Sequence, residues 1–320
     1  MKSISKQVFI SVIIGAAVYL ILTVYGNIGP VIKAFRYFNW LFIPLLLILS
    51  LLNYLFRFIK WDYYLKLLGI KAGKKLSASI FFSGLIMSVT PMKAGELLKS
   101  FLLKQTLEEP VSKTAPIIFA ERVTDFLALI IIGAAGGVLY NYGMELILIV
   151  FFFFALLVLI ISNRKLCLWF FEKLERINLV KKYSQKLYNL YESSYIMLKA
   201  KPLILMIFVS LLSWFFECLG VFIILYSFNP GISLFMSSFI YAFSTIFGAV
   251  TMLPGGLGAT EGSLTFLIMQ NGIAKESAVA STLIIRVVTL WFAVLVGMVS
   301  LYLFRKKFSD LLNNEKNKEI

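Results

Sequence analysis

A proline and a cluster of glycines interrupt a long apolar run near the end of the chain, and this interruption constrains the fold most. The run extends from Ile232 to about Met269, and the segment LPGGLGATEG occupies residues 253–262 within it. Proline and repeated glycine cannot sustain a straight helix. In lipid, irregular backbone is tolerated only where protein or a water-filled cavity surrounds it. The segment therefore predicts a broken helix with its turn at membrane depth; an ordinary loop between two short spans is the alternative.

Composition places this broken helix in a membrane protein. The chain has 320 residues, 60% of them apolar, and a mean hydropathy of +0.89. Several apolar runs reach the roughly 20 residues that a spanning helix needs. The net charge of +15 comes from basic residues that flank these runs, which indicates the positive-inside pattern and attraction to anionic lipid. We therefore predict an all-α polytopic membrane protein, a single integral membrane domain over residues 1–320, and no nucleic-acid partner.

The absence of histidine excludes several kinds of chemistry. Histidine-based triads, histidine metal sites and histidine proton relays cannot form in a chain without that residue. Cys167 and Cys218 lack metal-ligand spacing. We accordingly expect neither a metal nor another cofactor. Enzymatic activity stays open, although no Asp-rich or activated-serine motif is present.

Apolar segments along the chain predict about six full spans and two broken helices. The second broken helix covers residues 76–103, where Thr90-Pro91 and Gly95 interrupt the apolar pattern. A short loop is expected at 26–39 and an amphipathic, cytoplasmic linker at about 162–201. The predicted full spans are 8–25, 40–56, 116–140, 144–161, 203–228 and 277–304.

The two broken helices resemble each other. Residues 91–96 and 254–261 each place a glycine four positions after a proline and a glutamate soon afterwards, and Arg122 and Arg286 follow at similar distances. This pattern predicts inverted repeats at about 39–140 and 202–304, a recurrent transporter design whose site lies where the repeats meet.

The positive-inside rule then orients the chain in the cell membrane. If both broken helices are re-entrant, the basic segment 57–75, the linker and both termini all lie in the cytoplasm. If both were full crossings, the linker would face outward against the rule. We therefore predict re-entrant hairpins that enter from opposite sides, with cytoplasmic N- and C-termini.

Ionisable side chains at membrane depth are the candidate site residues. Each costs about 2.5–3.5 kcal/mol to insert unless it is paired or wetted. We add Lys93, which precedes Glu96 by three residues, and the residues of the second break. The candidate substrate-binding residues are Lys93, Glu96, Glu121, Arg122, Asp125, Glu217, Pro254, Gly255, Gly256, Gly258, Glu261 and Arg286.

Two interpretations of the arginines remain open. A guanidinium fork matches phosphate oxygens in two-point geometry, and half-helix N-termini near the glycines favour an anion. Arg122 and Arg286 would then hold a phosphate headgroup. Alternatively, they form structural pairs with Glu96 and Glu261.

The other charged candidates also have two interpretations. Asp125 either contributes to the site or pairs locally with Arg122. Glu217 is either a proton or cation site or part of plain packing beside aromatic residues. Lys93 and Lys99 bracket Glu96 and can neutralise it.

These segments resemble the membrane domain of the lysylphosphatidylglycerol synthase/flippase proteins. The resemblance covers nearly the whole chain and is carried by residues 91–96, 121–125, 253–262 and Arg286. It implies a flippase-like fold with two re-entrant regions. It also implies an anionic membrane lipid as substrate, of the aminoacyl-phosphatidylglycerol or polyprenyl-phosphate type.

The resemblance leaves a second function open. In the two-part relatives a large soluble C-terminal domain carries out aminoacyl transfer, whereas here the chain ends soon after the last predicted span. The alternative is therefore a membrane component of phosphatidylglycerol lysyltransferase, or of another headgroup-modifying enzyme, that works with a separate transferase. The sequence does not name the lipid, the direction or the energy source, and it is compatible with an oligomer.

Overall fold

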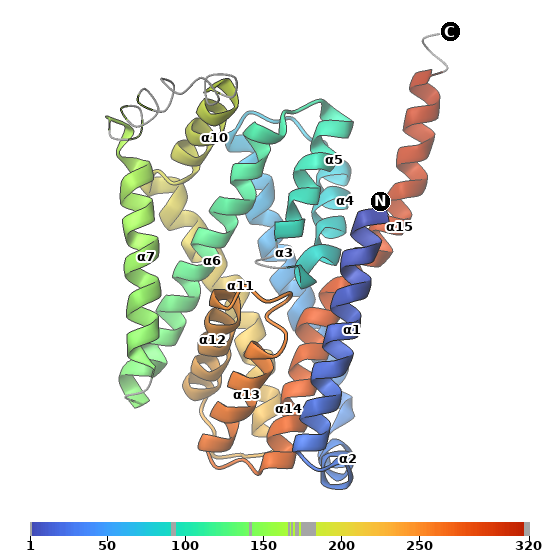
Figure 1. The fold of residues 1–320 in the computed structure, drawn as a ribbon, viewed down its shortest axis with the longest axis vertical. Coiled ribbons are helices and arrows are strands. Elements are labelled where there is room, and N and C mark those ends of the chain that lie inside the picture. Colours follow the sequence, from blue (N-terminus) through green and yellow to red (C-terminus); the bar gives the residue numbers. More distant parts are fainter. Residues whose placement is uncertain are drawn as a thin grey trace.

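The chain folds into a bundle of helices (Figure 1). The computed structural model describes residues 2–90, 94–140, 143–165, 167, 169, 173 and 184–316, and every regular element in these ranges is helical. The helices up to the linker are α1 (Lys2–Tyr25), α2 (Ile28–Tyr37), α3 (Ile43–Leu67), α4 (Lys74–Gly84), α5 (Leu98–Leu107), α6 (Val111–Tyr140) and α7 (Met144–Ser162). Those after it are α10 (Ser184–Met197), α11 (Ala200–Tyr226), α12 (Leu234–Val250), α13 (Ala259–Gln270), α14 (Lys275–Arg286) and α15 (Phe292–Lys316). The short elements are η1 (Trp40–Phe42), η2 (Leu85–Val89), η3 (Ala94–Leu97) and η4 (Val287–Trp291).

Length and composition confirm the polytopic membrane class. Four helical segments in the described ranges are long and apolar enough to cross a membrane, and the bent pair α1–α2 makes up to five. The 30-residue helix α6 would be about 45 Å long at 1.5 Å per residue, but it carries charged residues in its middle. The four segments are Trp40–Leu67, Met144–Ser162, Ala200–Tyr226 and Lys275–Phe304.

Residues 26–39 are not the loop that we predicted. Residues Ile28–Tyr37 form α2, which turns by 97° from α1. Its Val31 and Ala34 are buried, and Val31 packs against Val279 and Leu283 of α14. A short amphipathic helix that packs on α14 therefore occupies the segment for which the sequence predicted a loop.

Two helical hairpins reach into the bundle from opposite ends, as the broken-helix prediction requires. In Figure 1, α4 and α5 lie at the end that holds the start of α1, the end of α15 and α10, whereas α12 and α13 lie at the other end. The turn between α12 and α13 has positive φ at Gly255 (59°), Gly256 (66°) and Gly258 (89°). A Cβ on Gly255 would lie 3.3 Å from the Val89 Cα. The tips of the two hairpins therefore meet in the interior of the bundle.

The helix α14–η4–α15 changes its winding directly after Arg286. Residues 287–291 form a π-helical turn, and such turns leave backbone carbonyls without their usual partners. Two hydroxyls of α3 compensate, since Ser50 donates to the Val288 carbonyl (2.7 Å) and Tyr54 donates to the Thr289 carbonyl (3.0 Å). This irregular turn is thereby fixed against α3 beside the cavity described below.

Helix α3 runs further than the span predicted at 40–56. It continues to Leu67 and buries Arg57 and Lys60, which we had assigned to a basic cytoplasmic segment. Both side chains make ion pairs with carboxylates of other helices. A basic residue can stay in the bundle when such a partner is present.

The linker contains a helix, as its periodicity predicts, but α10 packs on α6 rather than only facing a membrane surface. Tyr191 and Met197 are buried there. Residues of the linker that are not in the ranges given above lie outside the described part, so the amphipathic prediction is tested only for α10.

The sidedness of the linker is testable at Cys167. In a Cys218→Ala background, a membrane-impermeant maleimide should label Cys167 in inside-out vesicles and not in intact cells. Partial burial raises the pKa of the Cys167 thiol, and the thiolate is the reactive form, so labelling should be faster at mildly alkaline pH. A Cys167→Ala, Cys218→Ala variant provides the blank. Labelling in intact cells would contradict the predicted orientation.

Candidate functional site

A cavity of about 310 Å³ lies where the two hairpin tips meet α3, α6, α7 and α11. Its lining has two chemical characters. Phe126 of α6 and Phe153, Phe154 and Leu157 of α7 give it an apolar wall. The polar lining includes Arg57, Arg122, Asp125, Glu217, Tyr241 and Arg286.

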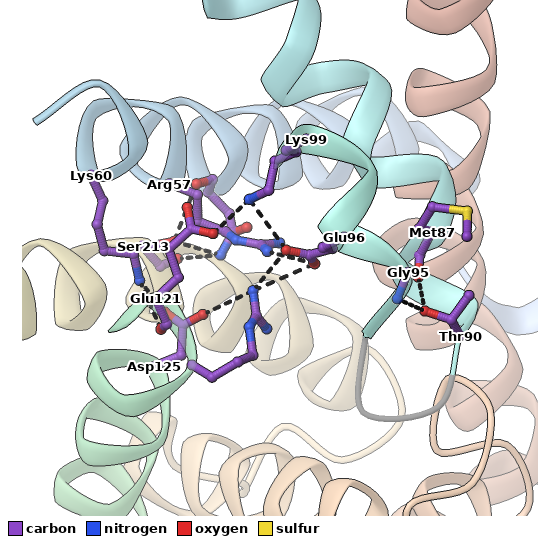
Figure 2. A network of polar contacts seen from close by, with 12 residues as sticks. Arg57, Lys60, Met87, Thr90, Gly95, Glu96, Lys99, Glu121, Asp125 and Ser213 are labelled. Atoms are coloured by element: carbon purple, nitrogen blue, oxygen red, sulfur yellow. Dashed lines mark hydrogen bonds and ion pairs between the residues drawn. The ribbon is translucent and has the colours of Figure 1, made fainter. Parts of the chain in front are cut away.

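A cluster of buried charged side chains lies beside the cavity, and one of its ion pairs joins Lys60 to Asp125 (Figure 2). Lys60 Nζ donates to Asp125 Oδ1 (2.6 Å) and to Ser210 Oγ (2.8 Å). It also donates to Thr124 Oγ1 (3.2 Å) and to the Glu121 carbonyl (3.3 Å). Four oxygens thus surround one buried ammonium, which is the condition for retaining a charge away from water.

A second buried ammonium, that of Lys99 on α5, joins the second leg of the first hairpin to α6. Lys99 Nζ lies 2.5 Å from Glu121 Oε2 and 3.4 Å from Glu96 Oε2, and 4.7 Å from the ring centroid of Trp61. The pair between Lys99 and Glu96 that the sequence allowed is present, although Glu121 is the nearer partner of Lys99. Lys93 lies outside the described residues.

Glu96 on η3 lies between two guanidinium groups (Figure 2). Arg57 Nη2 is 3.3 Å from Glu96 Oε1, and Arg122 Nη2 is 3.2 Å from Glu96 Oε2. Arg122 Nη2 is also 3.6 Å from Asp125 Oδ2. The structural pairs Glu96–Arg122 and Arg122–Asp125 that the sequence allowed are both present.

The corresponding pair in the second hairpin is tighter. Arg286 Nε donates to Glu261 Oε1 (2.6 Å), and Arg286 Nη2 donates to the Gly255 carbonyl (2.7 Å). Glu261 Oε2 accepts from the Gly258 N–H (2.7 Å), so the glutamate also caps the start of α13. Arg286 thus holds the irregular turn through both a side chain and a backbone carbonyl.

Glu217 of α11 faces the same cavity and accepts a short hydrogen bond from the Tyr241 hydroxyl of α12. The rings of Trp214 and Tyr241 contact each other at 6.1 Å between centroids. The site therefore has an aromatic and acidic flank that α11 and α12 form.

Three buried donors on the cavity lining have no hydrogen-bond partner among the residues that the structure describes. They are Ser88 Oγ, Arg122 Nε and Trp214 Nε1. A buried donor without a partner is costly, about 1–3 kcal/mol. Donors on three separate elements that face one cavity can be satisfied there by acceptor oxygens of water or of a ligand.

The predicted site residues fall into one region, with Lys93 outside the described part. The second-hairpin residues Gly255 and Gly256 line the cavity itself; Glu96, Glu121 and Glu261 lie behind it through their ion pairs. Sequence reasoning missed Arg57 and Lys60. The available signal was their helical register, because Ser50, Asn53, Arg57 and Lys60 share the buried face of α3.

Comparisons with known proteins agree with this architecture. Residues 8–297 match the family described as the lysylphosphatidylglycerol synthase TM region. A UPF0104 membrane protein of Methanocaldococcus jannaschii is 26% identical and aligns with 72% of this chain and 99% of its own length. UPF0104 membrane proteins of Methanothermobacter thermautotrophicus and Pyrococcus horikoshii are each 22% identical, over 95% and 93% of this chain and 97% of their own lengths.

Proposed function

We propose that this chain, which belongs to the family of lysylphosphatidylglycerol synthase transmembrane regions, moves a phosphate-headgroup lipid between the leaflets of the cell membrane. One observation carries the proposal: a single interior cavity is lined by Arg57, Arg122 and Arg286 and also has an apolar wall. Guanidinium groups bind phosphate oxygens through directed hydrogen bonds. The anionic membrane lipid is thus both substrate and partner.

The apolar wall supports an amphiphilic substrate rather than a free anion. Helix α7 packs on α6 and α10, and most of its surface is exposed. Phe153 is 60% exposed while lining the cavity, and its neighbour Phe154 is buried. A lipid could therefore place its phosphate among the arginines and leave its chains along α7. The volume of about 310 Å³ lies at the lower end of ligand pockets, about 300–1,000 Å³, which suits a headgroup and not a whole lipid.

The packing of the helices supports inverted repeats as the basis of movement. Helix α4 of the first half packs on α15 of the second, α12 of the second half packs on α6 of the first, and α3 and α11 pack on each other. If residues 39–140 and 202–304 are repeats, these contacts are equivalent under exchange of the halves. Rocking of one half against the other would expose a fixed site to each side in turn.

The proposal includes lipids of the aminoacyl-phosphatidylglycerol and polyprenyl-phosphate types. Both offer a phosphate to the arginines and long chains to the apolar wall. Their headgroups differ in size and charge, so the assay below compares them rather than assuming one.

Reconstitution in proteoliposomes tests the proposal. Fluorescent or radiolabelled lipids of both types, together with phosphatidylcholine as a comparison, are placed in one leaflet, and headgroup accessibility is followed with time. We expect the wild-type protein to move at least one phosphate lipid faster than empty liposomes. We expect Arg122→Gln to slow that movement about tenfold or more, since one lost charged hydrogen bond is worth about 1.5–3 kcal/mol.

A negative result would also be informative. If folded wild-type protein moves none of the lipids, the flippase proposal fails. The chain would then be better assigned as a membrane partner of a separate lipid-modifying transferase, and co-purification with such an enzyme would be the next measurement.

A further inference from the structure

We infer that Arg57 and Arg122 form a phosphate-binding site that Glu96 occupies in this structure as an internal substitute for the lipid phosphate. Substrate and Glu96 would then exchange on the same guanidinium groups during movement. This inference rests on the proposed function and deepens it, because it gives Glu96 a competing role rather than a binding one.

Distances provide the first argument. Glu96 is shared by Arg57, Arg122 and Lys99, at 3.3, 3.2 and 3.4 Å. Charge-assisted hydrogen bonds of this type are usually about 2.7–2.9 Å. In the same protein the pairs Lys60–Asp125, Lys99–Glu121 and Arg286–Glu261 measure 2.6, 2.5 and 2.6 Å.

The size and shape of a carboxylate explain why the distances around Glu96 are longer than those of the other three pairs. A carboxylate can accept about four hydrogen bonds on its two oxygens, but these acceptor sites lie in one plane, and Glu96 stays 3.2 Å or more from each of the three cations. A tetrahedral phosphate is larger and presents oxygens in more directions, so it can approach all of them more closely. The arrangement around Glu96 therefore fits a phosphate better than the carboxylate that fills it.

Charge provides the second argument. Four cations form the cluster, with three carboxylates among them. Withdrawal of Glu96 leaves two positive charges uncompensated, and the charge of a phosphodiester or phosphomonoester would then neutralise one or both. The cluster comprises Arg57, Lys60, Lys99, Arg122, Glu96, Glu121 and Asp125.

The position of Glu96 in the fold provides the third argument. It lies on η3, at the tip of the first hairpin, beside the cavity (Figure 2). Thr90 links the two legs of this tip: its Oγ1 accepts from the Gly95 N–H (2.9 Å) and donates to the Met87 carbonyl (2.6 Å). Exchange of Glu96 for a phosphate would therefore be transmitted to this hairpin.

The second hairpin provides an internal comparison. Glu261 is held by Arg286 and also by the Gly258 N–H of its own helix start. It cannot leave Arg286 without uncapping α13. Displacement of Glu261 would therefore disturb a helix start as well as a short ion pair, and we place the exchange at Glu96, whose ion pairs with the arginines are longer.

Binding to purified protein in detergent tests the inference. The probes are dihexanoyl-phosphatidylglycerol, glycerol 3-phosphate and inorganic phosphate, titrated by calorimetry. A site that is occupied internally binds a ligand more weakly in proportion to its free fraction, so Glu96→Gln should bind the short-chain lipid at least about tenfold more tightly than wild type. Arg57→Gln should bind it more weakly than wild type. Asp62→Asn removes the same charge outside the cavity and should bind as wild type does.

A second variant of Glu96 keeps the inference testable if Glu96→Gln does not fold. Glu96→Asp keeps the charge but shortens its reach, so it should bind with an affinity between those of wild type and Glu96→Gln. Tighter binding of all three probes would assign the site to phosphate in general, whereas tightening for the lipid alone would assign it to the headgroup in its lipid. If neither Glu96 variant binds any probe more tightly than wild type, the inference is overturned, even if wild-type protein moves lipids in proteoliposomes. A gain in binding without lipid movement would instead refute only the proposed function.

Discussion

Replacing Lys60 with methionine should destabilise the protein by about 3–5 kcal/mol, the usual loss when one partner of a buried ion pair is removed. Lys60 is 1% exposed and pairs with Asp125 at 2.6 Å. Methionine fills a similar volume but leaves the Asp125 carboxylate without its nearest cation. Arg122, at 3.6 Å, is too distant to replace it fully. The loss should appear as a lower midpoint of thermal unfolding in detergent.

A double variant separates the charge from the packing. Lys60→Met combined with Asp125→Leu removes both charges, and replacing a buried pair by apolar residues is often neutral or stabilising by about 1–4 kcal/mol. We expect most of the lost stability to return. Lys66→Met, at a side chain that is 68% exposed and pairs with Asp62, is the matched control and should change stability little. Wild-type stability of the Lys60→Met single variant would show that the pair does not hold the helices together.

The same double variant decides between the two interpretations of Asp125. Asp125 Oδ1 accepts from both Lys60 and Ser210, so much of its capacity is used within the scaffold. If Asp125 is structural, the double variant should move lipid at close to the wild-type rate. Stable protein that no longer moves lipid would place Asp125 in the substrate site.

The broken helices were the part of the fold that sequence reasoning could predict best. Proline and glycine act locally, so the turn at Pro254 to Gly258 can be recognised without knowing its neighbours. The same holds for the apolar spans. Helix α2 was missed because its buried residues make contacts with α14, which is distant in the sequence.

The candidate site was only partly predictable for a related reason. Charges inside an apolar run, such as Arg122 and Arg286, stand out in a sequence. Arg57 and Lys60 follow the run and look like residues at a membrane surface. Arg57 and Lys60 can be buried only because the fold places Glu96 and Asp125 of other helices beside them. A hydropathy pattern does not show which residues become neighbours in the fold.

Replacing Arg286 with glutamine should reduce lipid movement to the level of empty liposomes. The change leaves Glu261 as a buried carboxylate without its nearest cation, and it removes the donor to the Gly255 carbonyl. Arg286→Lys keeps the charge but loses the fork, so partial activity is expected. Lipid movement and thermal stability should be measured on the same preparations. Replacing Glu261 as well should reverse the loss of stability but not the loss of a guanidinium group from the cavity.

The second change is Glu261→Gln. In Arg286→Gln, Glu261→Gln the unpaired charge is gone, so stability should recover by much of the roughly 3–5 kcal/mol lost in the single variant. Lipid movement should not recover, since the cavity then lacks one of the three guanidinium groups proposed to receive the phosphate. The Glu261→Gln single variant shows what loss of the carboxylate charge beside Arg286 does by itself, because glutamine keeps an oxygen that can accept from the Gly258 N–H. If the double variant regains both stability and lipid movement, Arg286 belongs to the scaffold, and the phosphate would have to be held by Arg57 and Arg122 alone.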